Sequence, residues 1–329
     1  MESSFPIEIY FLAAGAGLAF SYLSSRFWLR QAESWKLVDH PGHRKIHATP
    51  MPLVGGLIVA FGLFGPLLLA ALSLNLQLMD REATELLRYG FGKRTLQLIG
   101  ILAGGIGMLL LGLLDDRHTL SAGKKLSGQI LIAAVVAATG TRITLFVPDI
   151  TFSYVITILW FITLVNAFNF TDNMNGLCAG LGAISAVLFA LHAALPGHYL
   201  VACFGFLVAG ALLGFMPLNY PTAKTFLGDS GSHLIGYLIA TMAVLPHFHH
   251  ETQLNKLTVI TPLLVLGIVL VDFLWVIGYR LSHGHPVYLG DNNHLSHQLV
   301  KRGFSKPLAV LLLWLAHLAI GATSFLLNK

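Results

Sequence analysis

Long apolar stretches recur along the whole chain, and they limit what it can fold into. Of its 329 residues, 55% are hydrophobic and 11% are charged. The stretches are about 17–25 residues long, which is the length that an α-helix needs to cross about 30 Å of hydrocarbon. The sequence therefore predicts an all-α, polytopic integral membrane protein with about ten transmembrane helices. We place these helices at residues 6–27, 53–75, 96–114, 126–140, 151–170, 176–195, 198–218, 231–246, 257–279 and 307–327.

The polar connections are too short to form a second domain. The longest are residues 28–52, 76–95 and 281–306, and none can enclose a core of its own. We therefore expect one transmembrane domain over residues 1–329. The N-terminus lacks the basic region of a cleaved signal peptide, so the first apolar stretch is expected to remain as a helix. Cys178 and Cys203 lie in apolar stretches without metal-type spacing, which predicts buried thiols.

Basic residues are distributed unevenly among the connections. The odd-numbered connections carry thirteen of the twenty Lys and Arg residues. By the positive-inside rule these connections are cytoplasmic, so both termini lie outside a cytoplasmic (inner) membrane. The net charge of +5 suits anionic lipid or phosphorylated substrates, although the same bias would produce much of it. We expect no nucleic-acid partner.

Four carboxylates lie where predicted helices reach water. Asp115 and Asp116 follow the third stretch, Asp172 follows the fifth and Asp229 precedes the eighth. Hydrocarbon tolerates a carboxylate badly, so this placement indicates a shared cytoplasmic site for charged substrates. Adjacent carboxylates repel each other, so the pair needs a metal, a shared proton or a basic partner such as Lys125. A solvated helix end is the alternative interpretation.

Polar residues also recur every three positions at the end of the fifth stretch. Asn166, Asn169, Asp172 and Asn175 would lie on nearby helix faces and line one wall of a site. Such groups suit hydrogen bonding to a polar ligand. The alternative is an ordinary capped helix end, with Gly176 in the turn.

Asp229 lies in the segment LGDSGS, where small residues meet a predicted helix N-terminus. The aspartate either caps that helix or binds Mg²⁺ while the exposed backbone amides receive a phosphate. The motif alone leaves both interpretations open.

The ninth connection reads GDNNHLSHQLVKRGFS. His294 and His297 would share a helix face, and Arg302 follows about one turn later, which suits an anionic leaving group. Zinc binding is the alternative, but no third ligand is evident. Two surface histidines without a ligand remain a third interpretation.

Further candidates lie in the first connection and the ninth stretch. Lys45 and His47 precede a proline-stiffened helix entry, where they would either hold a diphosphate or anchor the chain at the membrane. Asp272 is followed by Arg280 about two helical turns later, and an intramembrane aspartate usually has a partner or a function. The segment 247–250 contains three histidines, which we interpret as interfacial.

Five segments, taken together, resemble those of the polyprenyl-phosphate N-acetylhexosamine-1-phosphate transferases. The resemblance covers about residues 39–306. It implies transfer of a sugar 1-phosphate from a UDP-sugar to a membrane polyprenyl phosphate, with release of UMP and with Mg²⁺, or alternatively Mn²⁺, as cofactor. It leaves a homodimer open. The segments are RKIHATPMPLVGG, LLDDRHTLSAGKKLSGQ, NAFNFTDNMNGLCAG, FLGDSGSHLIG and NHLSHQLVKRGFS.

The resemblance assigns roles to individual residues. It implies that Asp115 and Asp116 engage the lipid phosphate or its proton, and that Asp229 binds Mg²⁺. It places Asn169 and Asp172 at the nucleotide site. The remaining matches are Lys125, Asp272, Arg280, His294 and His297.

The chain departs from the family pattern at three points. The central motif has Asn175 where a second acid is usual, Ser296 stands where an imidazole is often found, and a proline before Asp272 is missing. The segments are more similar to those of enzymes that use UDP-GlcNAc than to the branch that uses a MurNAc-pentapeptide substrate. A transporter or lipid scramblase is the alternative from another class, with the acids near the bilayer midplane and paired broken helices.

Overall fold

The computed structural model describes residues 7–40, 49–76, 81–144, 147, 149–245 and 256–328. Within these ranges the chain is helical apart from one short antiparallel pair of strands, β1 with β2. The elements are α1 (Glu8–Gln31), β1 (Val38–Asp39), β2 (Met51–Pro52), α2 (Gly55–Asn75), α3 (Arg81–His118), α4 (Ala122–Ala138), α5 (Ile150–Thr171), α6 (Leu177–Ala194), α7 (Tyr199–Asn219), α8 (Gly228–Val244), η1 (Lys256–Ile260), α9 (Thr261–Val265), α10 (Gly267–Ser282), α11 (Leu295–Lys301), α12 (Lys306–Thr323) and η2 (Ser324–Asn328).

The prediction of an all-α membrane protein is confirmed. Each of the ten predicted stretches coincides with a helix or a broken helix. By length and composition, six of the described helical segments can cross a membrane, and one bent pair would make a seventh. Helices α4 and α8 each have 17 residues and fall short on length. The count of ten spans and the outside position of the termini therefore stay predictions.

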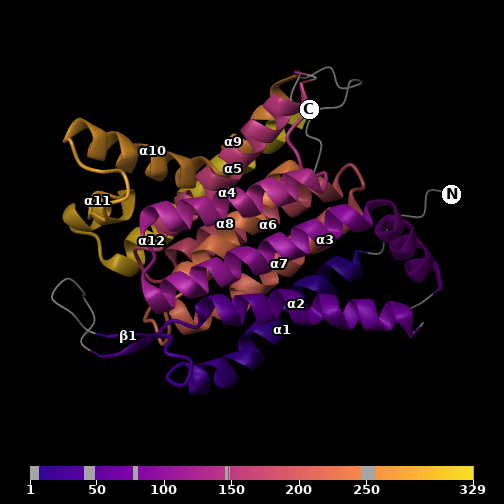
Figure 1. Cartoon of the computed structure of the whole chain (residues 1–329), viewed down its shortest axis with the longest axis horizontal. Coiled ribbons are helices and arrows are strands. Elements are labelled where there is room, and N and C mark those ends of the chain that lie inside the picture. Colours follow the sequence, from indigo (N-terminus) through magenta and orange to yellow (C-terminus); the bar gives the residue numbers. More distant parts are fainter. Residues whose placement is uncertain are drawn as a thin grey trace.

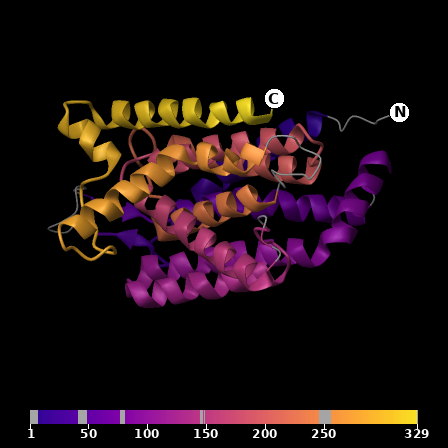
Figure 2. The same ribbon diagram turned by 90° about the horizontal axis from the view of Figure 1, so that it is seen from above.

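Helix α8 forms the centre of the bundle. All of its residues from Ser230 to Val244 are buried, and it packs among α2, α3, α5 and α6. Glycines permit this packing, since a Cβ at Gly56 would lie 2.5 Å from the backbone nitrogen of Gly231, and one at Gly112 would contact Ser230. The start of α8 is thus held tightly by α2 and α3. Figures 1 and 2 show the main helices side by side along the long axis of the molecule.

The short strands tie the first and seventh connections together at one end of the bundle. Val38 pairs with Pro52 in the β1–β2 ladder. The backbone nitrogen of Phe226 donates to the carbonyl of Pro52 at 2.9 Å, and Gly55 donates to the carbonyl of Phe226 at 3.1 Å. Strand β1 lies at the same end as α11, whereas the C-terminus lies at the opposite end (Figure 1).

The predicted helix over residues 257–279 is present but broken. Segments Thr258–Val265 and Gly267–Ser282 are bent by 70° relative to each other. Leu266 has the non-helical angles φ −99° and ψ 10°. At the next residue, a Cβ on Gly267 would lie 2.8 Å from the Ile320 side chain of α12, so only glycine fits without movement of its neighbour. The bend directs α10 away from the bundle toward α11 (Figure 1).

Both cysteines are free thiols. Cys178 is buried, as predicted, and its Sγ donates to the carbonyl of Phe168 at 3.4 Å. Cys203 is only half-buried, because α7 leaves part of that face uncovered. The three histidines of segment 247–250 lie outside the described residues.

Candidate active site

Asp229, at the start of α8, joins three helices. Its Oδ2 accepts a hydrogen bond from the Lys125 ammonium of α4 at 3.1 Å, and its Oδ1 accepts from the Asn169 amide of α5 at 2.5 Å. The same amide donates to the hydroxyl of Ser232 at 3.0 Å. Burial favours the neutral carboxyl, but bonding to Asp115 and the charge of Lys125 lower the pKa of Asp229 below its usual range.

Asp116, on the last turn of α3, caps the N-terminus of α8. Its two carboxylate oxygens accept from the backbone nitrogens of Asp229 at 2.8 Å and of Ser230 at 3.0 Å. These amides are among the groups that a helix leaves unpaired at its start. Gly228 has φ +74°, and a Cβ there would lie 2.8 Å from Asp116 Oδ2, so this arrangement requires glycine. The interpretation of Asp229 as the cap is wrong, because Asp116 fulfils that role.

Asp115 pairs instead with Lys125. The two form an ion pair, and the other oxygen of Asp115 accepts from the backbone nitrogen of Leu120 at 2.6 Å. Burial lowers the pKa of Lys125, but the charges of Asp229 and Asp115 outweigh it and raise the pKa. Lys125 is therefore charged and supplies the basic partner that the adjacent acids require.

Asp172 adds a fourth carboxyl group at the end of α5. Burial and, to a smaller extent, the negative charges of Asp229 and Asp116 together raise its pKa to about 8. The backbone amide of Gly228 opposes this shift. Four acids thus converge near the ammonium of Lys125. We call this group the acid cluster; its members are Asp115, Asp116, Asp172, Asp229 and Lys125.

A buried polar chain runs beneath the acid cluster. The amide nitrogen of Asn166 donates to Gln129 Oε1 at 2.7 Å, and Gln129 Nε2 lies 3.5 Å from His233 Nε2. Both Gln129 and His233 are fully buried. Sequence reasoning missed these two residues, because a single polar residue within an apolar helix does not indicate which partner it meets. The predicted residue Asn166 therefore lies in this chain and not among the acids.

A second group of polar residues lies on α10, on α11 and in the segment between them. Asp272 is 4% exposed, and its carboxylate accepts from His294 Nδ1 at 2.8 Å and from the backbone nitrogen of Leu295 at 2.6 Å. The carboxylate thereby fixes the proton of His294 on Nδ1 and leaves Nε2 for another partner. Asp272 thus orients a histidine, a contact that the sequence did not predict.

Arg280 completes this second group. Its Nε donates to Asp291 Oδ2 at 2.7 Å, and its guanidinium lies 4.6 Å from the centre of the Phe170 ring. Burial disfavours the charged form of Asp291, but the hydrogen bond from Arg280 lowers the pKa of the carboxyl overall. We call this second group the histidine cluster; its members are Asp272, Arg280, Asp291 and His294. Asp291 escaped prediction because its partner lies on another element.

The end of α5 touches both clusters, which supports one continuous site. Asn169 bonds to the acid cluster, whereas the ring of Phe170 lies edge-on to His294 with centroids 6.1 Å apart. Asn173 accepts a hydrogen bond from the hydroxyl of Ser296 at 2.6 Å. Residues predicted from two distant segments of the chain therefore surround the same helix end.

Other predicted residues lie at the edge or outside this arrangement. Asn175 donates to the carbonyl of Pro221 at 3.3 Å, and Gly176 makes the predicted turn with φ +79°. The ring of His297 lies 6.1 Å from that of His294. Burial and the neighbouring charges of His294 and Lys301 lower the pKa of His297.

Three of the predicted binding residues have no described contact with either cluster. Arg302 is exposed at the end of α11. Lys45 and His47 lie outside the described residues. Their predicted binding roles stay predictions.

The acid cluster fits a hard divalent cation in one respect. Burial and then the negative charges of Asp229 and Asp116 raise the pKa of Asp172, and carboxylate oxygens are the ligands that Mg²⁺ prefers. Within the described ranges, no group of three or more His, Cys, Asp or Glu residues could by itself hold a metal ion. Mg²⁺ usually binds through one or two carboxylates together with water and substrate phosphates, and the acid cluster offers carboxylates of this kind. This donor set gives no support for zinc at His294 and His297.

Comparison with known proteins identifies the family of this chain. Residues 98–247, which include every member of the acid cluster, match the model of glycosyl transferase family 4. The chain is 34% identical to the decaprenyl-phosphate N-acetylglucosaminephosphotransferase of Mycolicibacterium smegmatis, over 90% of this chain and 77% of the relative. It is 29% identical to a probable undecaprenyl-phosphate N-acetylglucosaminyl 1-phosphate transferase of Bacillus subtilis, over 89% of this chain and 77% of the relative.

A third relative belongs, by its name, to the branch that uses a MurNAc-pentapeptide substrate. The phospho-N-acetylmuramoyl-pentapeptide-transferase of Anoxybacillus flavithermus is 32% identical, over 91% of this chain and 92% of the relative. Enzymes of both branches thus align with nearly the whole chain. Together with the family model, these alignments show that the chain belongs to glycosyl transferase family 4.

Proposed function

We propose that this protein transfers N-acetylglucosamine 1-phosphate from UDP-GlcNAc to a polyprenyl phosphate in the membrane, with release of UMP. The observation that carries the proposal is the acid cluster, in which four carboxyl groups and Lys125 converge within the family core and adjoin the histidine cluster. A site of this kind suits phosphoryl transfer between anionic partners, because charge and positioning supply most of the catalysis.

In the proposed reaction, an oxygen of the lipid phosphate attacks the β-phosphorus of the UDP-sugar. A new P–O bond forms, the bond between the β-phosphorus and the bridging oxygen breaks, and UMP leaves with that oxygen. Lys125 offsets negative charge beside Asp115 and Asp229. Near pH 7 a phosphate monoester is largely dianionic, so the lipid needs orientation more than deprotonation.

Asp115 and Asp116 take different parts in this scheme. Both oxygens of Asp116 are engaged by the start of α8, so Asp116 positions Asp229. Asp115 is bound to the flexible ammonium of Lys125 and is the better candidate to meet the lipid phosphate or its proton. A covalent intermediate on Asp116 would sacrifice the cap of α8, which favours direct transfer.

We assign the metal site to Asp229. When bound, Mg²⁺, or alternatively Mn²⁺, would neutralise charge on the diphosphate of the donor. Lys125 and Asn169 already contact the two oxygens of Asp229 and would orient it. Asp172, whose pKa is raised by burial and by its acidic neighbours, is the further carboxyl group that would gain from a nearby cation.

The choice of GlcNAc over a MurNAc-pentapeptide rests on the histidine segment. Ser296 is 1% exposed and donates to Asn173, so an imidazole at this position would need space that these side chains fill. The pentapeptide branch carries successive histidines in this segment, and this chain does not. The relatives from Mycolicibacterium and Bacillus carry N-acetylglucosamine in their names, which agrees with this choice.

The site would face the cytoplasm. Arg117, Lys124, Lys125 and Lys301 all belong to the end of the bundle that carries the acid and histidine clusters, as the positive-inside rule expects of a cytoplasmic side. The nucleotide would then enter from the cytosol of a cell with an inner membrane, while the polyprenyl chain stays in the bilayer.

The direct test measures UMP release by the full-length protein in detergent. It receives polyprenyl phosphate, MgCl₂ and one of three donors: UDP-GlcNAc, UDP-GalNAc or UDP-MurNAc-pentapeptide. We expect release with UDP-GlcNAc that requires the lipid and stops with EDTA. Release only with the pentapeptide donor would move the protein to the other branch. Failure with all three donors would favour the transporter alternative.

A further inference from the structure

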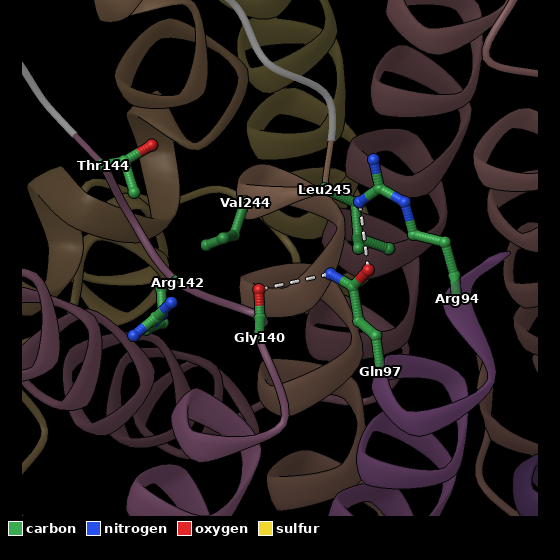
Figure 3. A pocket seen from close by; sticks show the side chains of 7 residues that line it. All are labelled: Arg94, Gln97, Gly140, Arg142, Thr144, Val244 and Leu245. Atoms are coloured by element: carbon green, nitrogen blue, oxygen red, sulfur yellow. Dashed lines mark hydrogen bonds between the residues drawn. The ribbon is translucent and has the colours of Figure 1, made fainter.

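A second polar site lies at the kink in α3, where Arg94 begins the apolar segment that ends near the acid cluster. There a pocket of about 160 Å³ is lined by Arg94, Gln97, Gly140 and Arg142 and by the last residues of α8. Arg94 and Gln97 lie on one side of the pocket and Arg142 on the other, with Gly140 between them (Figure 3). This cavity, called the far pocket below, takes no part in the proposed reaction.

The far pocket is positively charged without an internal counterion. Arg94 donates to Gln97 Oε1 at 3.0 Å, and Gln97 Nε2 donates to the carbonyl of Gly140 at 3.5 Å. Arg142 lies 5.3 Å from the centre of the Tyr154 ring, and its buried Nε has no hydrogen-bond partner. Within the described part of the chain, neither guanidinium forms an ion pair, and no carboxylate lines the pocket. Its chemistry is therefore that of an anion site.

The depth of the far pocket matches a membrane interface. Arg94 begins the 25-residue apolar segment Arg94–His118, which is about 37 Å long at 1.5 Å per residue. Asp116 lies near the other end of this segment, so the segment roughly spans the bilayer between the two sites. Leu96 and Ile99, which follow Arg94, are 65% and 57% exposed. A headgroup bound by Arg94 would have apolar surface beside it for acyl chains.

We propose that the far pocket binds the phosphate of an anionic phospholipid in the leaflet opposite the catalytic site. Guanidinium groups pair well with phosphate oxygens, and the guanidinium groups of Arg94 and Arg142 line the far pocket from opposite sides. A zwitterionic headgroup would bring its ammonium toward two arginines, and among the described residues no carboxylate lines the pocket to receive it. Free phosphate would gain the charge pairing but not the apolar contact. The bound lipid would link α3 and α8 with the segment that follows α4.

The test uses the delipidated full-length protein in neutral detergent. Thermal unfolding is followed by intrinsic fluorescence against rising concentrations of phosphatidylglycerol, phosphatidylcholine or inorganic phosphate. We expect phosphatidylglycerol to raise Tm, because a ligand that binds the folded state stabilises it. In Arg94→Gln and Arg142→Gln the midpoint concentration should rise about tenfold or more, since each removes a charge-assisted hydrogen bond.

Two variants serve as controls. Arg30→Gln removes an exposed arginine from the end of α1 and should leave the midpoint unchanged. Arg142→Lys keeps the charge and should retain most of the binding. If the glutamine variants do not fold, native mass spectrometry of the wild type should find phosphatidylglycerol retained over phosphatidylcholine in a mixture. An equal response to phosphatidylcholine, an equal response to inorganic phosphate alone, or wild-type midpoints in both glutamine variants would each overturn the proposal.

Discussion

The acid cluster and the histidine cluster adjoin each other but are held in different ways. The acids extend from the ends of α3, α5 and α8, which pack together in the core, with α8 buried along almost its whole length. Asp272, Arg280 and His294 are buried too, yet residues 283–290, which begin the segment that joins α10 to α11, are exposed throughout. Core packing places the acids, whereas side-chain bonds hold the histidine cluster together.

This difference predicts different responses to substitution. An isosteric change among the acids should alter charge while the packed helix ends keep their positions. The same change in the histidine cluster removes a bond that itself orients a catalytic candidate, so geometry and charge should change together. Three test substitutions, each from Asp to Asn, examine this contrast, because each removes a charge and leaves the shape of the side chain nearly unchanged.

The largest effect is expected from Asp229→Asn. The change removes one charge beside Lys125 and the proposed metal but leaves the packed start of α8 unchanged. We expect kcat for UMP release to fall on the order of 10²–10³-fold, as for loss of one preorganised electrostatic contact. Half-saturation by Mg²⁺ should need a higher concentration, because a charged ligand is lost.

Asp149→Asn is the matched control. Asp149 caps α5 at its other end by accepting from the backbone nitrogen of Phe152 at 2.6 Å, and Asn is an equally good cap. The turnover and the Mg²⁺ dependence of the Asp149→Asn variant should equal those of the wild type. Near-normal turnover of Asp229→Asn at limiting Mg²⁺ would remove Asp229 from the metal site.

Asp272→Asn should have the next largest effect. Asparagine can still accept from the backbone nitrogen of Leu295, but it loses the charge that holds His294 Nδ1. We expect kcat to fall roughly 10- to 100-fold, in the range of supporting carboxylates that orient a ligating histidine. Tm should also fall, because the buried pair loses its charge-assisted bond.

A double-mutant cycle decides whether Asp272 acts through His294. If it does, Asp272→Asn combined with His294→Asn should be no slower than His294→Asn alone, since interacting residues are not additive. Additive losses in kcat would mean that Asp272 acts on the substrate directly. The contrast between the clusters would then fail.

Sequence reasoning located the elements of both clusters and named Lys125 as one partner for the paired acids, but it predicted none of the other bonds. The acids could be predicted because a carboxylate at the end of an apolar stretch is costly and rarely incidental. The different contacts of Asp115 and Asp116 could not be predicted. Adjacent residues at a helix end point in different directions, and only packing decides which of them contacts α8. The cap made by Asp116 depends on Gly228, whose positive φ is not readable from GDSGS alone.

The fold shows the same limit. Each apolar stretch predicted from hydropathy coincides with a helix, but α11 lies outside these stretches. The bend at Leu266 lies where Gly267 meets Ile320, a contact between elements far apart in the sequence. The short, buried helix α8 also shows that a stretch of 17 residues can lie in a membrane protein without being long enough for a clear span. Buried partners such as Gln129 and His233 leave no pattern in a single sequence.

The smallest effect is expected from Asp291→Asn, which tests the exposed edge of the histidine cluster. Its carboxylate pairs with Arg280, and this bond keeps the pKa of Asp291 below its usual range. A lowered pKa in the folded state stabilises the protein above the unfolded value of about 4, and this contribution is lost as pH falls through the folded pKa. We expect the variant to lose about 1 kcal/mol, or about 2 °C in Tm, near pH 7. The difference between wild type and variant should stay constant from pH 7 to 5 and shrink below about pH 4. Thermal unfolding from pH 3 to 7 measures this, and a constant difference down to pH 3 would mean that the pair with Arg280 does not stabilise the cluster through charge.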